Sequence, residues 1–217
     1  MTRYNWSTND ARRHANGARL GIAVTPSAGL VRNVAVTRSH SPTAVALGDD
    51  WNRLPPIVRQ LHEPCGAIGS FHIERGAGLI AAVLAWLSGL PRPGMDVPTR
   101  LEVRPGLTAF TWIRHFGEDV LVTYQRALGP GAIAERLGTI ECVFLPTAHG
   151  EGLEYQQTGA SVCVGALRVP LPGFLAPRVK ARTQAVGDMM EVDVVVSAPV
   201  VGALLHYRGA ARPPMTE

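Results

Sequence analysis

Hydrophobic and polar residues alternate along most of the second half of the chain. After Pro98 this period of two continues almost to the end, through segments of roughly six to ten residues that Gly, Pro and Asp turns separate. The pattern predicts strands at 99–104, 107–116, 119–127, 132–137, 139–146, 152–159, 162–169, 178–186, 188–197 and 203–208. The segment 66–74 alternates in the same way and predicts one further strand.

Two segments have a helical pattern instead. Residues 78–90 are apolar on nearly every side and stop at a Gly and a Pro, which predicts a buried helix. A shorter helix, which Asp49 or Asp50 can cap, runs toward residue 61 with its apolar residues on one side. These are few helical residues for so long a chain, so a helix bundle is excluded.

A long antiparallel meander must curl or close to protect its edge strands. The predicted fold is therefore α+β, mainly β, with a long curved antiparallel sheet or barrel-like meander and one buried helix packed on its concave side. Such a shape commonly encloses an apolar hollow that holds a small ligand.

The length of 217 residues, of which 46% are hydrophobic, suffices for one sizeable core. Residues 1–44 show no period and predict a disordered or loosely attached basic arm. A single globular domain is expected over 45–212, with a flexible tail at 213–217. The arm either stays mobile or is exchanged with a neighbour, and a homodimer is left open.

The positive charge of the chain is concentrated in this arm. The net charge is +4 and the isoelectric point is near 9.3, but six arginines stand before residue 44 against Asp10 alone, so the remainder is close to neutral. Basic and aromatic residues do not interleave on one strand or helix. Nucleic acid is therefore not a predicted partner.

The three cysteines are odd in number and widely spaced, with no CxxC pair, which favours a reducing compartment. No run of about 18 apolar residues is present, so no membrane span is expected. The predicted location is cytoplasmic, and the predicted partner is an apolar small molecule.

Several short motifs follow one another in a fixed order along the chain. They are Leu47-Gly48-Asp49-Asp50-Trp51, Phe71-x-Ile73-Glu74-Arg75-Gly76, Trp112-x-Arg114-x-Phe116-Gly117, Glu135-Arg136-x-Gly138, Val169-Pro170-Leu171-Pro172 and Tyr207-x-Gly209. In these motifs the chain resembles the bacterial family catalogued as domain of unknown function 4166, which occurs alone and fused behind NAD(P)-binding oxidoreductase modules. The resemblance implies the fold and a pocket but names no reaction. No GxGxxG follows a strand here, so no cofactor is predicted.

Every second residue of the predicted strand at 107–116 points to the same face, and one such face carries an arginine among aromatic residues: Phe110, Trp112, Arg114 and Phe116. If this face points inward, the arginine needs a partner, because an unpaired buried charge is costly. The partner is either Glu135 or Glu74 in a structural ion pair, or a carboxylate, enolate or phenolate of a ligand.

Three residues are candidates for catalysis: Arg114, Glu135 and Tyr124. Glu135 and Arg136 are adjacent and must face opposite sides of a strand, and Glu135 is the one expected inside, as a general base or as the counter-ion of Arg114. Tyr124 shares the parity of Val120 and Val122, where its hydroxyl would orient a carbonyl or donate a proton, or would belong to an ordinary core tyrosine.

The candidates for substrate binding are Trp112, Phe110, Phe116, Trp86, His206 and Tyr207. His206 and Tyr207 are adjacent in the last strand, so one of them must point inward, as a proton shuttle or as a structural residue. The remaining histidines show no metal-ligand spacing, and no metal is predicted. The Pro-rich segment 169–177 cannot be a central strand and forms either a lid over the barrel mouth or a rigid crossover.

These features favour a cofactor-independent enzyme that cyclises or isomerises a polyketide- or terpenoid-like molecule inside the barrel, by orientation and acid/base help. A non-catalytic carrier of a lipid or pigment is one alternative. An accessory module that docks onto a separate oxidoreductase is another, and a large exposed apolar patch outside the barrel would favour it.

Overall fold

The computed structural model describes residues 41–214, so the predictions for residues 1–40 and 215–217 lie outside the described part. Eleven antiparallel strands make up most of it: β1 (Cys65–Arg75), β2 (Gly94–Pro105), β3 (Phe110–Phe116), β4 (Asp119–Gly129), β5 (Ala132–Leu137), β6 (Ile140–His149), β7 (Gly152–Val164), β8 (Leu167–Pro170), β9 (Arg178–Val186), β10 (Met189–Ala198) and β11 (Gly202–Arg212). The predicted mainly β fold is confirmed.

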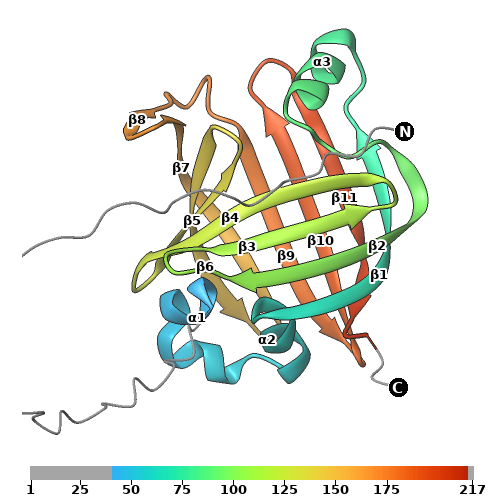
Figure 1. The fold of residues 1–217 in the computed structure, drawn as a ribbon, viewed down its shortest axis with the longest axis vertical. Coiled ribbons are helices and arrows are strands. Elements are labelled where there is room, and N and C mark those ends of the chain that lie inside the picture. Colours follow the sequence, from blue (N-terminus) through green and yellow to red (C-terminus); the bar gives the residue numbers. More distant parts are fainter. Residues whose placement is uncertain (1–40, 215–217) are drawn as a thin grey trace, which may run out of the picture. The chain divides into compact units, whose positions relative to one another are not determined.

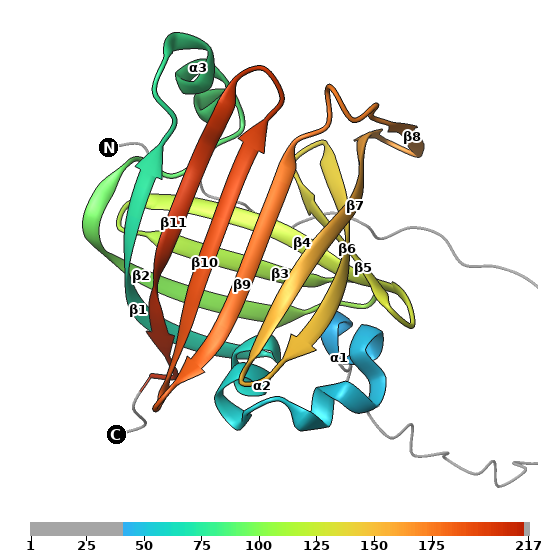
Figure 2. The same cartoon turned by 180° about the vertical axis from the view of Figure 1, so that it is seen from behind.

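The sheet closes into a barrel. Its strand order is β6-β5-β4-β3-β2-β1-β11-β10-β9-β7-β8, and a further pairing of β6 with β7 joins the two sides. In Figure 1, β2, β3 and β4 cross in front of β9, β10 and β11, and Figure 2 shows the same two layers from behind. Closure leaves β8 alone outside the ring, because it pairs only with β7.

Tight turns connect most neighbouring strands. Between β3 and β4 only Gly117 and Glu118 form the turn, and Gly117 has a φ of 58°. Glycine adopts such an angle without a steric cost, which is why a two-residue hairpin is available at this point.

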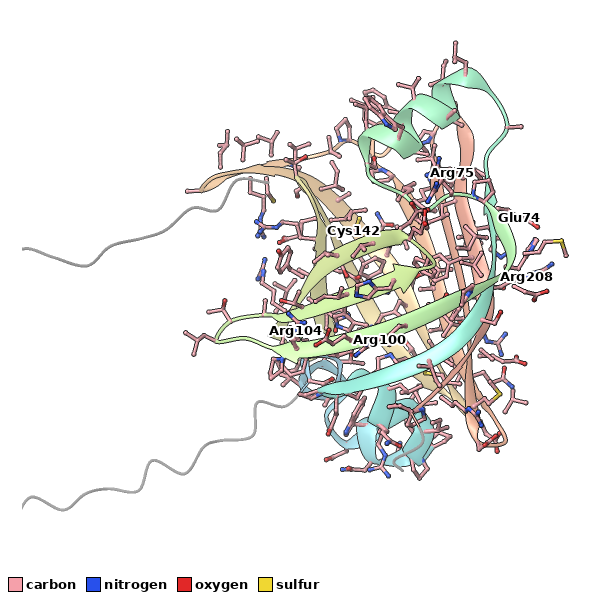
Figure 3. The ribbon with its side chains drawn as sticks, turned by 45° about the vertical axis from the view of Figure 1, so that its right-hand side comes forward. Glu74, Arg75, Arg100, Arg104, Cys142 and Arg208 are labelled. Atoms are coloured by element: carbon pink, nitrogen blue, oxygen red, sulfur yellow. The ribbon has the colours of Figure 1, made fainter. Side chains whose placement is uncertain are left out.

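Side chains alternate between the interior and the outer surface along each strand. Arg100 and Arg104 of β2 and Arg208 of β11 belong to the outer set and are exposed (Figure 3). The inner set builds the main hydrophobic core, which includes Phe71, Phe116 and Leu205.

Three short helical segments precede β1: α1 (Pro42–Leu47), the 3₁₀ helix η1 (Gly48–Arg53) and α2 (Pro56–His62). The single helix predicted toward residue 61 is thus divided, because Pro55 and Pro56 interrupt it and α2 starts with Pro56. In Figure 1 these segments lie together at one end of the barrel.

The first helix of the described part, α1, starts at Pro42, ahead of the helix that the sequence pattern predicts. The hydroxyl of Ser41 accepts a hydrogen bond from the backbone N–H of Ala44 at 3.2 Å and caps α1, which the sequence pattern missed. Ser41 and Thr43 have no exposed surface. A helix of six residues is too short for its period to be recognised.

The predicted helix at 78–90 forms as α3 (Leu79–Leu87), but the prediction that it is buried is wrong. Leu79 is 81% exposed and Trp86 is 75% exposed, whereas Ala81 and Ala85 are buried. The small alanines allow this side to approach the barrel, and the large apolar side chains are left exposed. In Figure 1, α3 lies at the rim, above the strand ends. None of the helices in the described part is long and apolar enough to cross a bilayer.

The strand predicted at 162–169 is also divided. Its first residues continue β7, a turn follows, and its last residues form β8. Residues 171–177 then lead to β9, with Phe174 70% exposed and Ala176 buried.

Candidate functional site

The barrel encloses a cavity of about 370 Å³. Its wall is mainly apolar and comes from both layers of the sheet, with Leu101 and Leu121 on one side and Val179, Val192 and Val194 on the other. The volume lies within the range of about 300–1,000 Å³ that is usual for small-molecule pockets. The hollow predicted from the strand pattern is therefore present.

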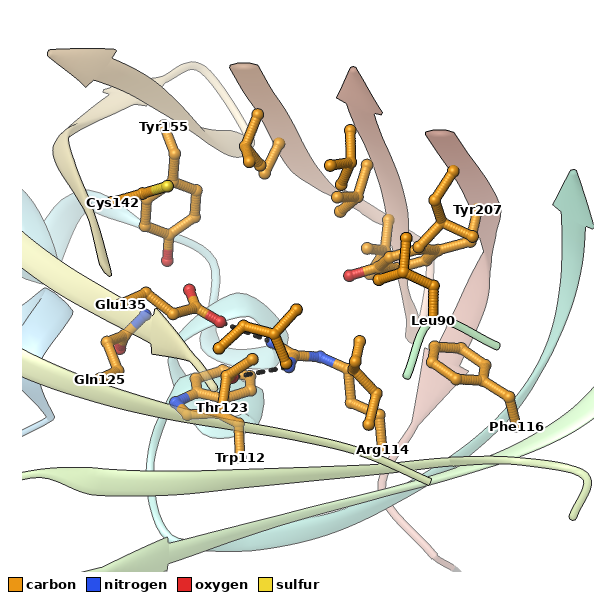
Figure 4. A pocket seen from close by; sticks show the side chains of 18 of the residues that line it. Leu90, Trp112, Arg114, Phe116, Thr123, Gln125, Glu135, Cys142, Tyr155 and Tyr207 are labelled. Atoms are coloured by element: carbon orange, nitrogen blue, oxygen red, sulfur yellow. Dashed lines mark hydrogen bonds and ion pairs between the residues drawn. The ribbon is translucent and has the colours of Figure 1, made fainter. Parts of the chain in front are cut away.

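Arg114 of β3 reaches into this cavity (Figure 4). Its Nη1 donates a hydrogen bond to Thr123 Oγ1 at 2.9 Å, and its Nη2 lies 3.4 Å from Glu135 Oε1. The guanidinium carbon lies 5.2 Å from the ring centre of Trp112. These contacts follow from the order of β3, β4 and β5 in the sheet, which brings the inner faces of the three strands together.

The ion pair between Arg114 and Glu135 is buried but long. The two side chains are 16% and 23% exposed, and a charge-assisted hydrogen bond normally measures about 2.7–2.9 Å. Burial acts to lower the pKa of Arg114, but Tyr207 and Glu135 outweigh it, and the pKa lies above its ordinary value. The guanidinium is therefore charged and keeps donors that Glu135 does not saturate.

His62 closes the end of the cavity at α2. It is 3% exposed and packs between aromatic rings, with ring centres 5.5 Å from Trp112 and 6.3 Å from Tyr155. Its Nδ1 lies 2.7 Å from the carbonyl oxygen of Val58, which only accepts, so Nδ1 carries the proton and Nε2 holds the lone pair. Burial lowers the pKa of His62 to about 4, and the imidazole is neutral at pH 7.

Two tyrosines complete the polar part of the wall. The hydroxyls of Tyr155 and Tyr207 point toward the hollow in Figure 4. Burial raises the pKa of both phenols, so both are protonated at neutral pH. The Thr43 hydroxyl lies 3.3 Å from Tyr155 Oη and 3.4 Å from Gln125 Oε1. Hydrogen bonds therefore connect α1 to the inner face of the barrel.

Two buried polar atoms of the wall have no hydrogen-bond partner among the described residues. They are the indole Nε1 of Trp112, a donor, and the hydroxyl of Thr183. Both residues line the cavity and are only 6% and 7% exposed. Each of these atoms has less than 1 Å² of accessible surface, so both are packed against protein and turned away from the hollow, and neither contributes to the polar part of its wall.

Cys142 also lines the cavity. Burial raises the pKa of its thiol to about 12, so the thiolate is scarce at neutral pH. The side chain is therefore a small hydrophobe of the wall and not a nucleophile.

Five of the residues predicted for the site line the cavity together: Trp112, Arg114, Phe116, Glu135 and Tyr207. Phe110 shares their parity but lies beyond the cavity, where it packs with Val103 and Trp112 in a separate small cluster. The strand is longer than the hollow, so parity alone does not place Phe110 at the site.

Three other predicted residues lie outside the cavity. Tyr124 is 43% exposed and has the guanidinium of Arg136 5.6 Å from its ring centre, because the inner face of β4 is the one that carries Thr123. His206 faces outward, with Nε2 3.0 Å from Asp193 Oδ1. Trp86 stands on the exposed side of α3.

The sequence pattern missed His62, Tyr155 and the polar pair of Thr123 and Gln125. His62 follows Val58 by four residues on a helix whose buried residues are Val58, Leu61 and His62, so its spacing was the available signal. Thr123 and Gln125 occupy inner positions of β4 that an apolar interior would not predict.

A closed antiparallel barrel with an internal, mainly apolar cavity and a few buried polar groups defines the class of this protein. The chain belongs to the family described as domain of unknown function (DUF4166), whose model matches residues 54–210. The family resemblance found in the sequence motifs is thus confirmed.

The comparison with curated proteins finds no match. Among solved structures, the chain is similar to the crystal structure of a secretary abundant heat soluble (SAHS) protein from Ramazzottius varieornatus. The TM-score is 0.35 and the identity 10%, over 69% of this chain and 93% of that chain. A similarity of this size does not establish a shared fold.

Proposed function

We propose that the protein binds a small, mainly apolar molecule inside the barrel. The observation that carries the proposal is the cavity of about 370 Å³, whose mainly apolar wall also presents Arg114, Glu135 and His62. Filling the cavity with an apolar body removes that body from water, and a polar end can accept from the guanidinium donors that Glu135 does not saturate.

A neutral fluorescent dye such as Nile red tests the proposal. Wild-type protein should bind one dye per chain, and Val192→Phe, which adds bulk to the cavity wall, should weaken binding at least about tenfold, or 1.4 kcal/mol. The matched control is Val120→Phe, since Val120 is 48% exposed on the outer face. Equal binding by both variants, or no binding by wild type, would contradict the proposal.

A catalytic role is the second candidate function. Support comes from a neutral imidazole with a free lone pair and a carboxylate that share one buried cavity with a guanidinium. A base and an electrostatic stabiliser in such a cavity suit cofactor-independent isomerisation or cyclisation of a polyketide- or terpenoid-like molecule.

The experiment for catalysis uses the molecule that is recovered with the purified protein. Glu135→Gln should abolish its turnover and keep its binding, whereas a pure carrier would show no turnover with wild type either. Arg114→Ala is expected to lose both. If Glu135→Gln turns the molecule over at the wild-type rate, Glu135 is not the base.

We place this function in the cytoplasm. Cys65, Cys142 and Cys163 are all free in the structure, which supports a reducing compartment. An accessory role beside an oxidoreductase has support from the exposed apolar side of α3, and we rank it below ligand binding.

A further inference from the structure

The charges that line the cavity cancel. Arg114 and Glu135 form an ion pair of opposite charges, and the described residues of the wall include no other Arg, Lys, Asp or Glu. His62 is neutral near pH 7 because burial lowers its pKa, and the two tyrosines are protonated. The buried wall thus has no net charge.

This balance restricts the ligand. A carboxylate placed beside Arg114 would share the guanidinium with Glu135 and leave one uncompensated negative charge in a buried site. An ammonium group placed beside the guanidinium would leave one uncompensated positive charge in the same buried site. Buried charges without compensation are strongly unfavourable, whereas a neutral polar group adds none.

The hydrogen-bonding groups that reach the cavity define the polar end of the ligand. Arg114 donates to Thr123 and Glu135 and keeps further guanidinium donors, which require an acceptor. His62 Nε2 is an acceptor with no hydrogen-bond partner among residues 41–214. A hydroxyl group offers both an acceptor oxygen and a donor hydrogen, and so matches this set.

We propose that the ligand is a neutral molecule with an apolar body and a hydroxyl-bearing end that lies beside Arg114 and His62, and that Glu135 excludes carboxylates. This inference rests on the proposed function. It assigns to Glu135 the role of a specificity-determining residue, which holds with or without catalysis.

Two probes of equal chain length, 1-decanol and decanoate, test the inference by displacement of Nile red at pH 7.5. Wild type should prefer the alcohol. Glu135→Gln leaves the charge of Arg114 uncompensated, so it should lower the ratio of alcohol to carboxylate affinity at least about tenfold, or 1.4 kcal/mol. The change in the ratio is independent of the different hydrophobicity of the two probes. Glu154→Gln, at an exposed position of β7, changes the net charge equally and should leave the ratio unchanged.

A pH series on wild type decides the question if Glu135→Gln does not fold. A site that accepts only neutral ligands binds decanoate as its acid, so its affinity should rise about tenfold between pH 7.5 and 6.5, as the acid fraction does. The affinity for 1-decanol, measured in the same series, reports any titration of the protein itself and should stay constant.

Three outcomes are distinct. Tighter binding of decanoate than of 1-decanol by wild type would overturn the inference and leave the proposed function intact. An unchanged ratio in folded Glu135→Gln would remove Glu135 from its role. Absence of dye binding to wild type would overturn the proposed function itself.

Discussion

At the scale of single residues, the pair of Arg114 and Glu135 is the main electrostatic feature of the interior. Its 3.4 Å separation and its burial mean that each group depends on the other more than on water. Removing one partner leaves the other charge without compensation, whereas replacing both with apolar residues of similar size does not.

We expect Arg114→Met to lower the free energy of unfolding by about 3 kcal/mol, and the double variant Arg114→Met/Glu135→Leu to recover most of that loss. Urea denaturation measures both. The control is Arg104→Met, because the pair of Arg104 and Glu102 is exposed to solvent and its loss should leave the free energy of unfolding nearly unchanged. A double variant that is less stable than Arg114→Met would refute this account of the pair.

His62 gives the protein a predictable pH dependence. Its pKa is about 4 when folded against 6.5 for the free side chain, so the unfolded chain binds more protons between these values. The contribution of neutral His62 to stability is complete above about pH 6.5 and declines as the pH falls toward 4. From pH 7 to pH 5 the loss should be about 2 kcal/mol.

Urea denaturation of wild type and His62→Gln at the two pH values checks this expectation. The variant should lose about 2 kcal/mol less than wild type over the same interval. His149→Gln removes an exposed histidine and should behave as wild type does. An identical pH dependence in wild type and His62→Gln would show that His62 is not buried in its neutral form.

Part of the site could be predicted from the sequence. The parity of β3 placed Arg114 and Trp112 on one face, and the adjacent Glu135 and Arg136 had to divide between the two faces. Tyr124 was expected in the interior because it shares the parity of Val120 and Val122, which suggested an apolar inner face. The inner positions of β4 instead hold Thr123 and Gln125. Polar residues of a cavity wall look like surface residues in a sequence, which is why they were missed.

At the scale of elements, α3 differs most from its prediction. Its apolar residues occupy all sides, and such a pattern indicates burial only if a neighbour covers each side. The barrel covers one side, at Ala81 and Ala85. The strands were easier to predict than this helix, and the predicted limits of β5 and β9 agree with the structure.

Substitutions in α3 should separate the two sides of the helix. Ile80→Gln and Trp86→Gln should each change the free energy of unfolding by less than about 0.5 kcal/mol, because both residues are well exposed. Ala85→Gln should lower it by about 2 kcal/mol, since Ala85 is 1% exposed and has no room for a longer side chain. Large losses from Ile80→Gln and Trp86→Gln would mean that a partner or another part of the chain covers this side.

The hydroxyl of Thr43 connects α1 to the barrel interior through Tyr155 and Gln125. Thr43→Val keeps the shape of the side chain and leaves the buried amide oxygen without this donor, so the free energy of unfolding should fall by about 1–2 kcal/mol. Thr147→Val, at an exposed position of β6, should have little effect in the same urea experiment. Equal effects of the two variants would contradict the assigned role of Thr43.

At the scale of the whole molecule, closure of the sheet makes the cavity. The alternation of residues predicted a curved antiparallel meander but left its closure open, because period two describes each strand and not its partner. The pairing of β6 with β7 closes the sheet, because each of these strands then has a partner on its otherwise free edge. Closure by pairing between strands leaves the interior free for side chains and for a ligand.

The most direct test of this account is a crystal structure of the protein with 10-bromodecan-1-ol, in which the bromine is located by its anomalous scattering. We expect one bromine per chain inside the barrel, with the hydroxyl end of the probe within hydrogen-bond distance of the Arg114 guanidinium or His62 Nε2. A bromine site outside the barrel, or an interior filled by side chains, would contradict the central claim that the barrel is a binding site for a neutral apolar molecule.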